Sequence, residues 1–305
     1  NVGLISALVG PDDYVVYDQY SHASFYDGLK MCNARGIHFL HNDVENLKTK
    51  LEDARKLNPK NIYVGVEGVY SMDGDIAPLD EIVAVCKQYD AILLVDDAHG
   101  TGTIGKHGGG SGDYFGLDNE IDITMGTFSK SLASLGGFIA GDEDVIHYVK
   151  HHARSLIFSA SITPASAASA LAALEVMREE PERVKRVIEI GDYMRTNLRK
   201  LGFDTGNSMT PVVPVVIGDD MKAILTWKTL FDSGVYVNVV ISPAVPQGHQ
   251  LLRTSYMAIH TDEQLDRVLG IFEQVGKQMG LIEKGMEPRE RSYDPALSEE
   301  RLGGQ

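Results

Sequence analysis

Lys130 is the residue of this 305-residue sequence whose type and surroundings most favour covalent chemistry. It lies in the segment 126–131, after an apolar stretch and before the small residues of 133–137. A lysine in such a place can be partly desolvated, which favours the neutral amine, and a neutral amine can form a Schiff base with an aldehyde cofactor. The neighbouring hydroxyls of Thr127 and Ser129 could bind a phosphate. A lysine considered alone is more often a solvated surface charge, so the neighbouring residues are needed to distinguish a cofactor site from an exposed side chain.

Asp96 and His99 follow a second apolar run, residues 91–95. The carboxylate of Asp96 is expected at a largely buried sheet end, where it needs a partner. A protonated pyridine nitrogen is such a partner, and a carboxylate beside it keeps the ring cationic, so that the ring can store carbanion charge. A helix cap or an internal salt bridge explains Asp96 equally well. His99 could contact the cofactor's phenolic oxygen or orient Asp96, although a lone histidine is usually structural.

His22 and Arg253 are two further candidates. His22 follows Asp18 by four residues, and its imidazole could stack on a flat ring, although capping the following helix is the simpler role. Arg253 lies within an apolar run, where an unpaired guanidinium is costly. A bidentate contact with a substrate carboxylate would satisfy Arg253. An internal salt bridge is the competing explanation.

The segment 100–105 has the spacing Gly-x-Gly-x-x-Gly directly after a predicted strand. This spacing can indicate a dinucleotide site when a helix begins at the last glycine. Here the following residues, 106–110, read Lys-His-Gly-Gly-Gly and cannot begin such a helix. We therefore do not predict nicotinamide binding.

The elements that position these residues are short β-rich runs alternating with amphipathic helices. Strands are predicted at residues 14–18, 37–40, 62–66, 92–95 and 121–125. Helices are predicted to begin near Asp43 and at Pro78. Such alternation is typical of an α/β fold with a mainly parallel sheet and helices on both faces. Because the carboxyl ends of parallel strands meet at one edge, the polar residues that follow them are expected in one cleft.

The pattern changes after residue 163, the predicted end of a large domain that begins at residue 1. Connecting helices are predicted over 164–206 and a small α+β domain over 207–282. In the small domain we expect strands at 212–217, 235–241 and 251–257 and helices at 221–231 and 262–279. The tail 283–305 is charged and lacks an apolar period, so it is predicted to be flexible or to lie on a partner.

The composition is that of a globular protein, 43% hydrophobic and 23% charged. The formal net charge of −15 is spread along the chain, which argues against nucleic acid or an anionic membrane as the main partner. Cys32 and Cys86 are the only cysteines, and their separation supports neither a disulfide framework nor a zinc site. A cytoplasmic location fits, and no metal is expected. Residues 1–10 are apolar but lack a basic flank, so neither a signal peptide nor a transmembrane segment is predicted.

Four motifs resemble those of the α-oxoamine synthases, a branch of the fold-type I pyridoxal-phosphate enzymes. They are Asp18-x-x-x-His22-Ala23-Ser24 and the segments 70–75, 95–100 and 126–130. The resemblance extends to about Met279. It implies a fold-type I large domain, with a mainly parallel sheet covered by helices, followed by a small C-terminal α+β domain.

The resemblance also assigns roles to the catalytic candidates. Lys130 would hold pyridoxal 5'-phosphate as a Schiff base and later move the α-proton of the substrate. Asp96 would pair with the pyridine nitrogen, and His22 would stack on the ring beside the substrate. Each of these roles agrees with the chemistry argued above from residue type.

Further positions match cofactor and substrate contacts of that family. Ser71 and His99 match residues at or near the cofactor's ring oxygen, and Thr127 matches a phosphate ligand. Ser159 matches a residue that reaches the phosphate bound by the other subunit, which implies a homodimer with shared active sites. Arg253 matches the arginine that holds the carboxylate of the amino acid.

The implied reaction is the decarboxylative condensation of an amino acid with an acyl-CoA thioester. Residues 127–142 and 241–246 are most similar to bacterial serine palmitoyltransferases, which make 3-ketodihydrosphingosine from serine and palmitoyl-CoA in sphingolipid biosynthesis. 8-Amino-7-oxononanoate synthase and glycine C-acetyltransferase share the quoted motifs and stay open as alternatives. An aminotransferase of the same fold and a non-catalytic partner subunit are more distant ones, and Lys130 argues against the latter.

Two expectations concern the surroundings of the chain. Members of the family have an upstream Gly-rich segment whose backbone helps bind the cofactor phosphate, and Asn1 comes after the corresponding position. Residues 1–305 alone are therefore expected to have weak or no activity. A lipid product would also imply peripheral contact with a membrane.

Overall fold

The computed structural model describes residues 1–117 and 119–282, and its chain divides into two compact units. The first unit comprises residues 1–70 and 76–181, and the second comprises residues 71–75 and 182–282. The division at residue 181 falls inside the stretch predicted to connect two domains. The separate assignment of residues 71–75 has no counterpart in the sequence prediction. The predicted flexible tail, 283–305, lies outside the described residues.

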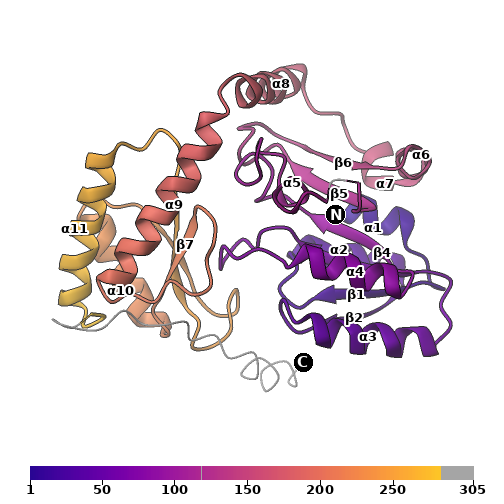
Figure 1. The fold of residues 1–305 in the computed structure, drawn as a ribbon, viewed down its shortest axis with the longest axis horizontal. Helices are drawn as coiled ribbons and strands as arrows, with labels where there is room; N and C mark the ends of the chain where they lie inside the picture. Colours follow the sequence, from indigo (N-terminus) through magenta and orange to yellow (C-terminus); the bar gives the residue numbers. More distant parts are fainter. Residues whose placement is uncertain (118, 283–305) are drawn as a thin grey trace. The chain divides into compact units, whose positions relative to one another are not determined.

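The first unit is built on a six-stranded sheet with the order β2-β1-β3-β4-β5-β6 (Figure 1). Its strands are β1 (Tyr14–Asp18), β2 (Arg35–Phe39), β3 (Ile62–Glu67), β4 (Ile92–Asp96), β5 (Ile123–Thr127) and β6 (Gly137–Gly141). The first five pair in parallel, as predicted, and their positions agree with the predicted strands to within a few residues. The sixth, β6, pairs antiparallel with β5 and was not predicted, because a five-residue run that begins and ends with glycine lacks the usual composition of a strand.

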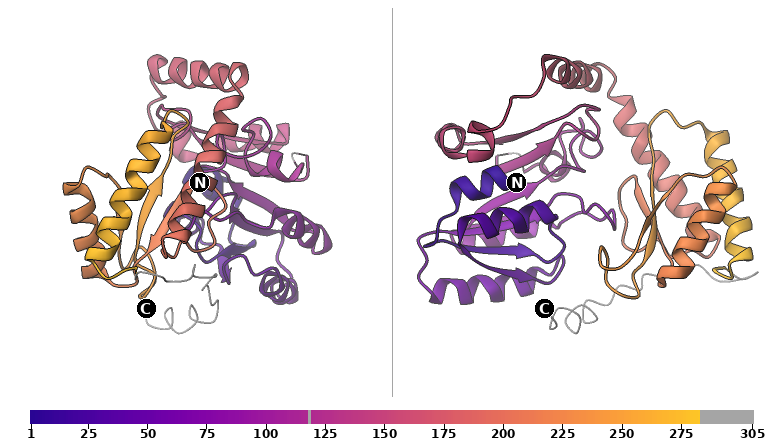
Figure 2. Two further views of the ribbon diagram at one scale, coloured as in Figure 1. Left: turned by 60° about the vertical axis from the view of Figure 1, so that its left-hand side comes forward. Right: turned by 180° about the vertical axis from the view of Figure 1, so that it is seen from behind.

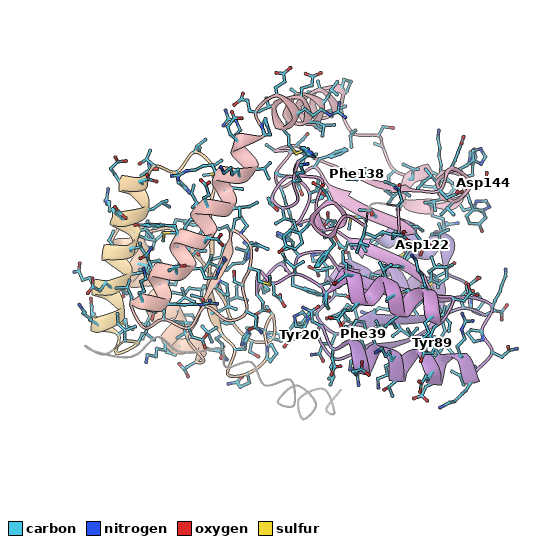
Figure 3. The ribbon with its side chains drawn as sticks, viewed as in Figure 1. Tyr20, Phe39, Tyr89, Asp122, Phe138 and Asp144 are labelled. Atoms are coloured by element: carbon cyan, nitrogen blue, oxygen red, sulfur yellow. The ribbon has the colours of Figure 1, made fainter. Side chains whose placement is uncertain are left out.

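Helices cover both faces of this sheet, as the figures show from two sides (Figures 1 and 2). The helices of the first unit are α1 (Val2–Leu8), α2 (Ala23–Cys32), α3 (Val44–Lys56), α4 (Leu79–Gln88), α5 (Ser111–Phe115), α6 (Glu143–His152), α7 (Arg154–Ile157) and α8 (Pro164–Glu179). One hydrophobic core lies between the sheet and α3 and α4, and it includes Phe39, which is 1% exposed (Figure 3). A second core joins the opposite face to α1, α2 and α6. The predicted two-sided α/β architecture is therefore present.

The second unit contains a three-stranded antiparallel sheet with the order β7-β9-β8. Its elements are α9 (Glu182–Lys200), β7 (Val212–Val216), α10 (Asp220–Asp232), β8 (Asn238–Val240), β9 (Leu251–Ser255) and α11 (Asp262–Gln278). One core cluster contains Val213, Leu252 and Phe272, which pack strands against helices. The predicted α+β composition is correct. The prediction of a strand over 235–241 is too long, since only β8 pairs within it.

Candidate active site

The alternation of side chains along β4 and β5 decides which polar residues share a face of the sheet. Leu93 and Val95 of β4 lie in the core beneath α3 and α4, whereas Leu94 lies in the core beneath α1 and α2. Since successive side chains point to opposite faces, Asp96 belongs to the α1 and α2 face. On β5, Met125 packs in that same core, so Thr127 belongs to the same face. Two neighbouring strands therefore end with Asp96 and Thr127 on one side of the sheet.

The carboxylate of Asp96 is held by two donors. The side-chain amide of Asn1 donates to Oδ2 at 2.6 Å, and the backbone N–H of Ala98 donates to Oδ1 at 3.1 Å. Asp96 is half-buried. The prediction of a carboxylate at the end of an apolar strand is correct, although the deeply buried carboxyl of this turn is that of the next residue, Asp97.

Asp97 is 1% exposed and accepts a hydrogen bond from the backbone N–H of Ser111 at 3.0 Å. Desolvation by burial raises the pKa of its carboxyl group to about 7. Gly68, Gly100 and Gly110 surround it so closely that a Cβ on any of them would overlap its carboxylate oxygens. Of the three glycines whose spacing resembles a dinucleotide motif, Gly100 makes room for this buried carboxyl, and turns rather than a helix follow Gly105. The prediction that residues 106–110 do not begin a helix is therefore correct.

His22 is the N-cap residue of α2. Its Nδ1 accepts from the backbone N–H of Ser24 at 3.2 Å and lies 2.8 Å from the Ser24 hydroxyl. The capping role considered from the sequence is therefore present. The side chain of His22 is exposed, so capping leaves its ring accessible. His99 is half-buried, in the turn that follows Asp97.

Lys130 lies in a tight loop between β5 and β6. Phe128 donates its backbone N–H to Gly136 O at 2.9 Å, closing the loop. The hydroxyls of Thr127 and Ser129 are 2.9 Å apart, and the Thr127 hydroxyl donates to Gly136 O at 3.1 Å. Lys130 is exposed in the described chain, so the expected desolvation is not found. The physical reason is its position three residues beyond the strand end, outside the layer that the helices cover.

Ser71 and Arg253 both belong to the second unit and contact each other. The Nε of Arg253 donates to the backbone carbonyl of Ser71 at 2.5 Å, and its Nη1 donates to the Ser255 hydroxyl at 2.9 Å. Desolvation by burial lowers the pKa of the guanidinium. Arg253 makes no ion pair with a carboxylate of the described residues. An internal salt bridge therefore does not explain why this arginine lies within an apolar strand. The sequence did not indicate that Ser71 and Arg253 are neighbours.

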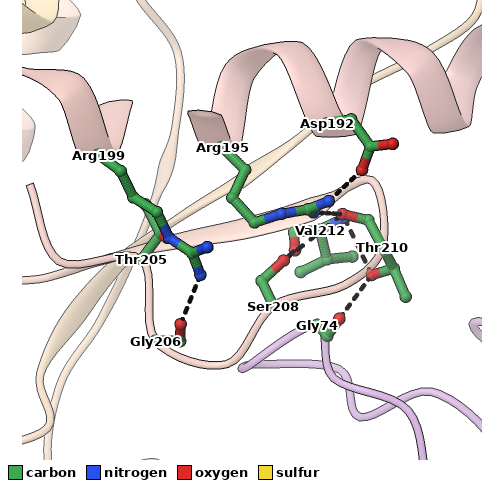
Figure 4. A network of polar contacts seen from close by, with 9 residues as sticks. All are labelled: Gly74, Asp192, Arg195, Arg199, Thr205, Gly206, Ser208, Thr210 and Val212. Atoms are coloured by element: carbon green, nitrogen blue, oxygen red, sulfur yellow. Dashed lines mark hydrogen bonds and ion pairs between the residues drawn. The ribbon is translucent and has the colours of Figure 1, made fainter. Parts of the chain in front are cut away.

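The segment 71–75 is held by hydrogen bonds to the rest of the second unit (Figure 4). The Thr210 hydroxyl and the Met209 backbone N–H each donate to Gly74 O at 2.9 Å. The imidazole of His249 pairs with the carboxylate of Asp73 at 2.7 Å. These contacts fix the backbone that carries Ser71. Sequence reasoning missed Asp73 and His249, since residues so far apart in the chain give no local signal.

The predicted site residues thus fall into three groups. His22, Asp96, His99, Thr127, Ser129 and Lys130 lie in the first unit, near the ends of strands or in the turns after them. Ser71 and Arg253 form a contact pair in the second unit. Ser159 is exposed in the chain after α7.

The residues of the first unit fit the chemistry of pyridoxal phosphate. An amine for the aldehyde, a carboxylate for the pyridine nitrogen and hydroxyl donors for the phosphate come from the loop after β5 and the end of the adjacent β4. A half-buried carboxylate held by two donors suits a ring cation, because the fixed acceptor needs no reorganisation. Among residues 1–117 and 119–282 no cluster of His, Cys, Asp and Glu suited to a metal ion occurs.

Comparison with known proteins agrees with this chemistry. The aminotransferase class I and II family matches residues 1–272. Serine palmitoyltransferase of Sphingobacterium spiritivorum is 47% identical over 278 residues, which are 91% of this chain and 69% of that protein. 8-Amino-7-oxononanoate synthase of Thermosipho melanesiensis is 42% identical over 282 residues, 92% of this chain and 72% of that protein.

A solved structure of serine palmitoyltransferase from S. paucimobilis with a bound PLP–myriocin aldimine matches with a TM-score of 0.88 and 39% identity, over 92% of this chain and 71% of that one. The chain belongs to the aminotransferase class I and II family. Its relatives include both serine palmitoyltransferases and 8-amino-7-oxononanoate synthases. The predicted family and fold class are therefore confirmed.

Proposed function

We propose that this protein is a pyridoxal-phosphate-dependent acyltransferase that condenses an amino acid with an acyl-CoA thioester and releases carbon dioxide. The observation that carries the proposal is the placement of Asp96 and the Lys130 loop at the ends of two adjacent strands, within a chain 47% identical to a serine palmitoyltransferase. We further propose serine and palmitoyl-CoA as the substrates and 3-ketodihydrosphingosine as the product. A cytoplasmic location is part of the same proposal, with peripheral membrane contact for the lipid product.

Pyridoxal phosphate, when bound, supplies an aldehyde for imine formation and a ring that accepts electrons. Lys130 would provide the amine that bonds this aldehyde and would afterwards carry the α-proton of the substrate. Asp96 would hold the proton on the pyridine nitrogen, and His22 and His99 would contact the ring and its oxygen. Thr127 and Ser129 would donate hydroxyl hydrogen bonds to the phosphate. The two hydroxyls are hydrogen-bonded to each other at 2.9 Å and so lie close enough to face one anion, towards which the Thr127 hydroxyl would turn from Gly136 O.

Arg253 is proposed to bind the carboxylate of the amino acid, with Ser71 beside it at the cofactor. Support comes from its partners, which are a carbonyl and a hydroxyl and leave the positive charge without a described carboxylate. A half-buried guanidinium without an anion is costly, and a substrate carboxylate would remove that cost. Binding the carboxylate fixes which bond of the α-carbon is broken.

A homodimer with shared sites is proposed from the surface around Ser159. Leu156, Ile157 and Phe158 precede it and are 58%, 48% and 75% exposed. Three consecutive large apolar side chains in water are unfavourable in a monomer, and a second copy of the chain would cover them. Ser159 would then reach the phosphate of the partner's cofactor.

The substrates can be assigned by measuring free thiol released from acetyl-, pimeloyl- and palmitoyl-CoA with serine, alanine and glycine. Release that requires serine and palmitoyl-CoA supports the proposal. Preference for alanine with pimeloyl-CoA would identify an 8-amino-7-oxononanoate synthase, and preference for glycine with acetyl-CoA a glycine C-acetyltransferase. Nitrogen transfer to a keto acid without thiol release would refute the condensation and indicate an aminotransferase.

A further inference from the structure

A continuous chain of hydrogen bonds joins His22 to Asp96 in the first unit. The Nδ1 of His22 lies 2.8 Å from the Ser24 hydroxyl. The side-chain amide of Asn1 lies 2.9 Å from that same hydroxyl and 2.6 Å from Asp96 Oδ2. The residues come from the N-termini of α1 and α2 and from the end of β4, so three separate elements meet here.

The proton positions in this chain follow from its fixed ends. The backbone N–H of Ser24 can only donate, and it points at His22 Nδ1 at 3.2 Å, so that nitrogen must be an acceptor. At the other end, an ionised Asp96 can only accept, so the Asn1 nitrogen, rather than its oxygen, must face it. The hydroxyl of Ser24 therefore receives a hydrogen bond from Asn1 and donates its own proton to His22.

This direction fixes the tautomer of His22. A proton on Nδ1 would face two donors, the hydroxyl and the backbone N–H of Ser24. The neutral ring consequently carries its single proton on Nε2. The ring is then uncharged and offers one donor on the side away from the chain of hydrogen bonds. An uncharged imidazole avoids repulsion with a cationic pyridine ring paired to Asp96.

We infer that Ser24 and Asn1 are positioning residues. Ser24 holds His22 as the Nε2–H tautomer, and Asn1 ties the Ser24 hydroxyl to the carboxylate of Asp96. The hydrogen-bond chain is a property of the protein without cofactor. Its effect on the reaction rests on the proposed function, whereas the tautomer of His22 can be measured whatever the protein catalyses. The inference about the tautomer and the proposed function can therefore be refuted separately.

The test is ¹⁵N–¹H correlation spectroscopy of the imidazole of His22 in the cofactor-free protein, with His22→Gln to assign its signals. The expected signals show a proton on Nε2 and an unprotonated Nδ1. Ser24→Ala removes the shorter contact to Nδ1, from the hydroxyl at 2.8 Å, and leaves only the longer one from the backbone N–H at 3.2 Å, so a minor second set of signals from the Nδ1–H form should appear. Ser24→Thr keeps a hydroxyl and should restore the original spectrum. Ser6→Ala, which removes a hydroxyl on α1 that bonds only Val2 O, is the matched control and should change nothing.

A Nδ1–H signal in the unmodified protein, or identical spectra for the unmodified and Ser24→Ala proteins, would overturn the inference. Asn1→Ala should leave the tautomer in place, because Ser24 still donates to His22. It should weaken cofactor affinity about fivefold, the factor that corresponds to one typical hydrogen bond. If cofactor affinity is unchanged, Asn1 does not position Asp96. If the tautomer is as expected but no thiol is released from any acyl-CoA, the proposed function fails while the hydrogen-bond chain stands.

Discussion

At the scale of single residues, the turn after β4 places two adjacent carboxyl groups in different surroundings. Asp96 is half-buried and held by donors, whereas Asp97 is 1% exposed and enclosed by three glycines. The sequence indicates that a carboxyl ends an apolar strand, but it does not show which of two neighbours is enclosed. That depends on Gly68 and Gly110, which are distant in the sequence and meet Asp97 only in the folded chain.

The burial of Asp97 predicts a pH-dependent term in stability. Its pKa rises from an ordinary 3.8 to about 7 in the folded protein, so between these values the folded state binds more protons than the unfolded state. Stability from this group therefore falls as pH rises, by at most about 1.4 kcal/mol per pH unit, and levels off above pH 7. Asp97→Asn should remove this term. Urea unfolding of both proteins at several pH values measures it, and parallel pH profiles would contradict the prediction.

Lys130 is the residue on which the proposed covalent step depends. Lys130→Ala should abolish the visible absorption of the lysine–cofactor Schiff base and lower the rate of thiol release roughly 10²–10⁴-fold, the range for a lost proton-transferring group. Lys106→Ala, an exposed lysine in the turn after β4, is the control and should have neither effect. A borohydride-reduced covalent adduct that persists in Lys130→Ala would show that another lysine holds the cofactor.

At the scale of elements, the segment 71–75 is held by the second unit although both its neighbours in the chain belong to the first. Gly74 makes this connection possible. Its φ is +67°, and a Cβ there would overlap the carbonyl oxygen of Val212. The same backbone carries Ser71 to Arg253, so the contact between a predicted cofactor ligand and a predicted substrate ligand depends on this turn.

Gly74→Ala should therefore destabilise the second unit by about 2–4 kcal/mol, from left-handed strain plus overlap with Val212. Gly280→Ala is a matched control, because Gly280 has φ +60° and open space at the Cβ position. It should cost only about 1 kcal/mol. Chemical unfolding monitored by the fluorescence of Trp227, which lies in α10 of the second unit, gives both values. Equal losses of unfolding free energy in the two variants would show that overlap with Val212 does not contribute to the destabilisation.

At the scale of the whole molecule, the described chain presents apolar side chains that its own core does not use. Leu156, Ile157 and Phe158 are exposed beside Ser159, and this agrees with a homodimer as proposed above. None of the helices in the described part of the chain has the length and apolar character needed to cross a bilayer.

The proposed sharing of active sites between two subunits predicts complementation between two inactive variants. Lys130→Ala and Ser159→Asp should each be inactive alone, the second because a carboxylate repels the phosphate. Mixed after unfolding and refolding together, half of the dimers pair one of each and contain one intact site, so about a quarter of the normal activity should return. No recovery, with dimers of both variants confirmed by sedimentation, would exclude a shared site. A Phe158→Asp protein should sediment as a monomer.

From local patterns, the sequence predicted the alternation of the five parallel strands with helices, the family and the residue types of the candidate site, because strand composition, helix caps and short motifs are local properties of the chain. It identified the strands of the parallel sheet to within a few residues. Three contacts are visible only in the folded chain: Arg253 contacts Ser71, Asn1 and Ser24 link His22 to Asp96, and Asp97 is the enclosed carboxyl. Each of these depends on which distant segments pack together, and the pairing of distant segments leaves no local pattern in a single sequence.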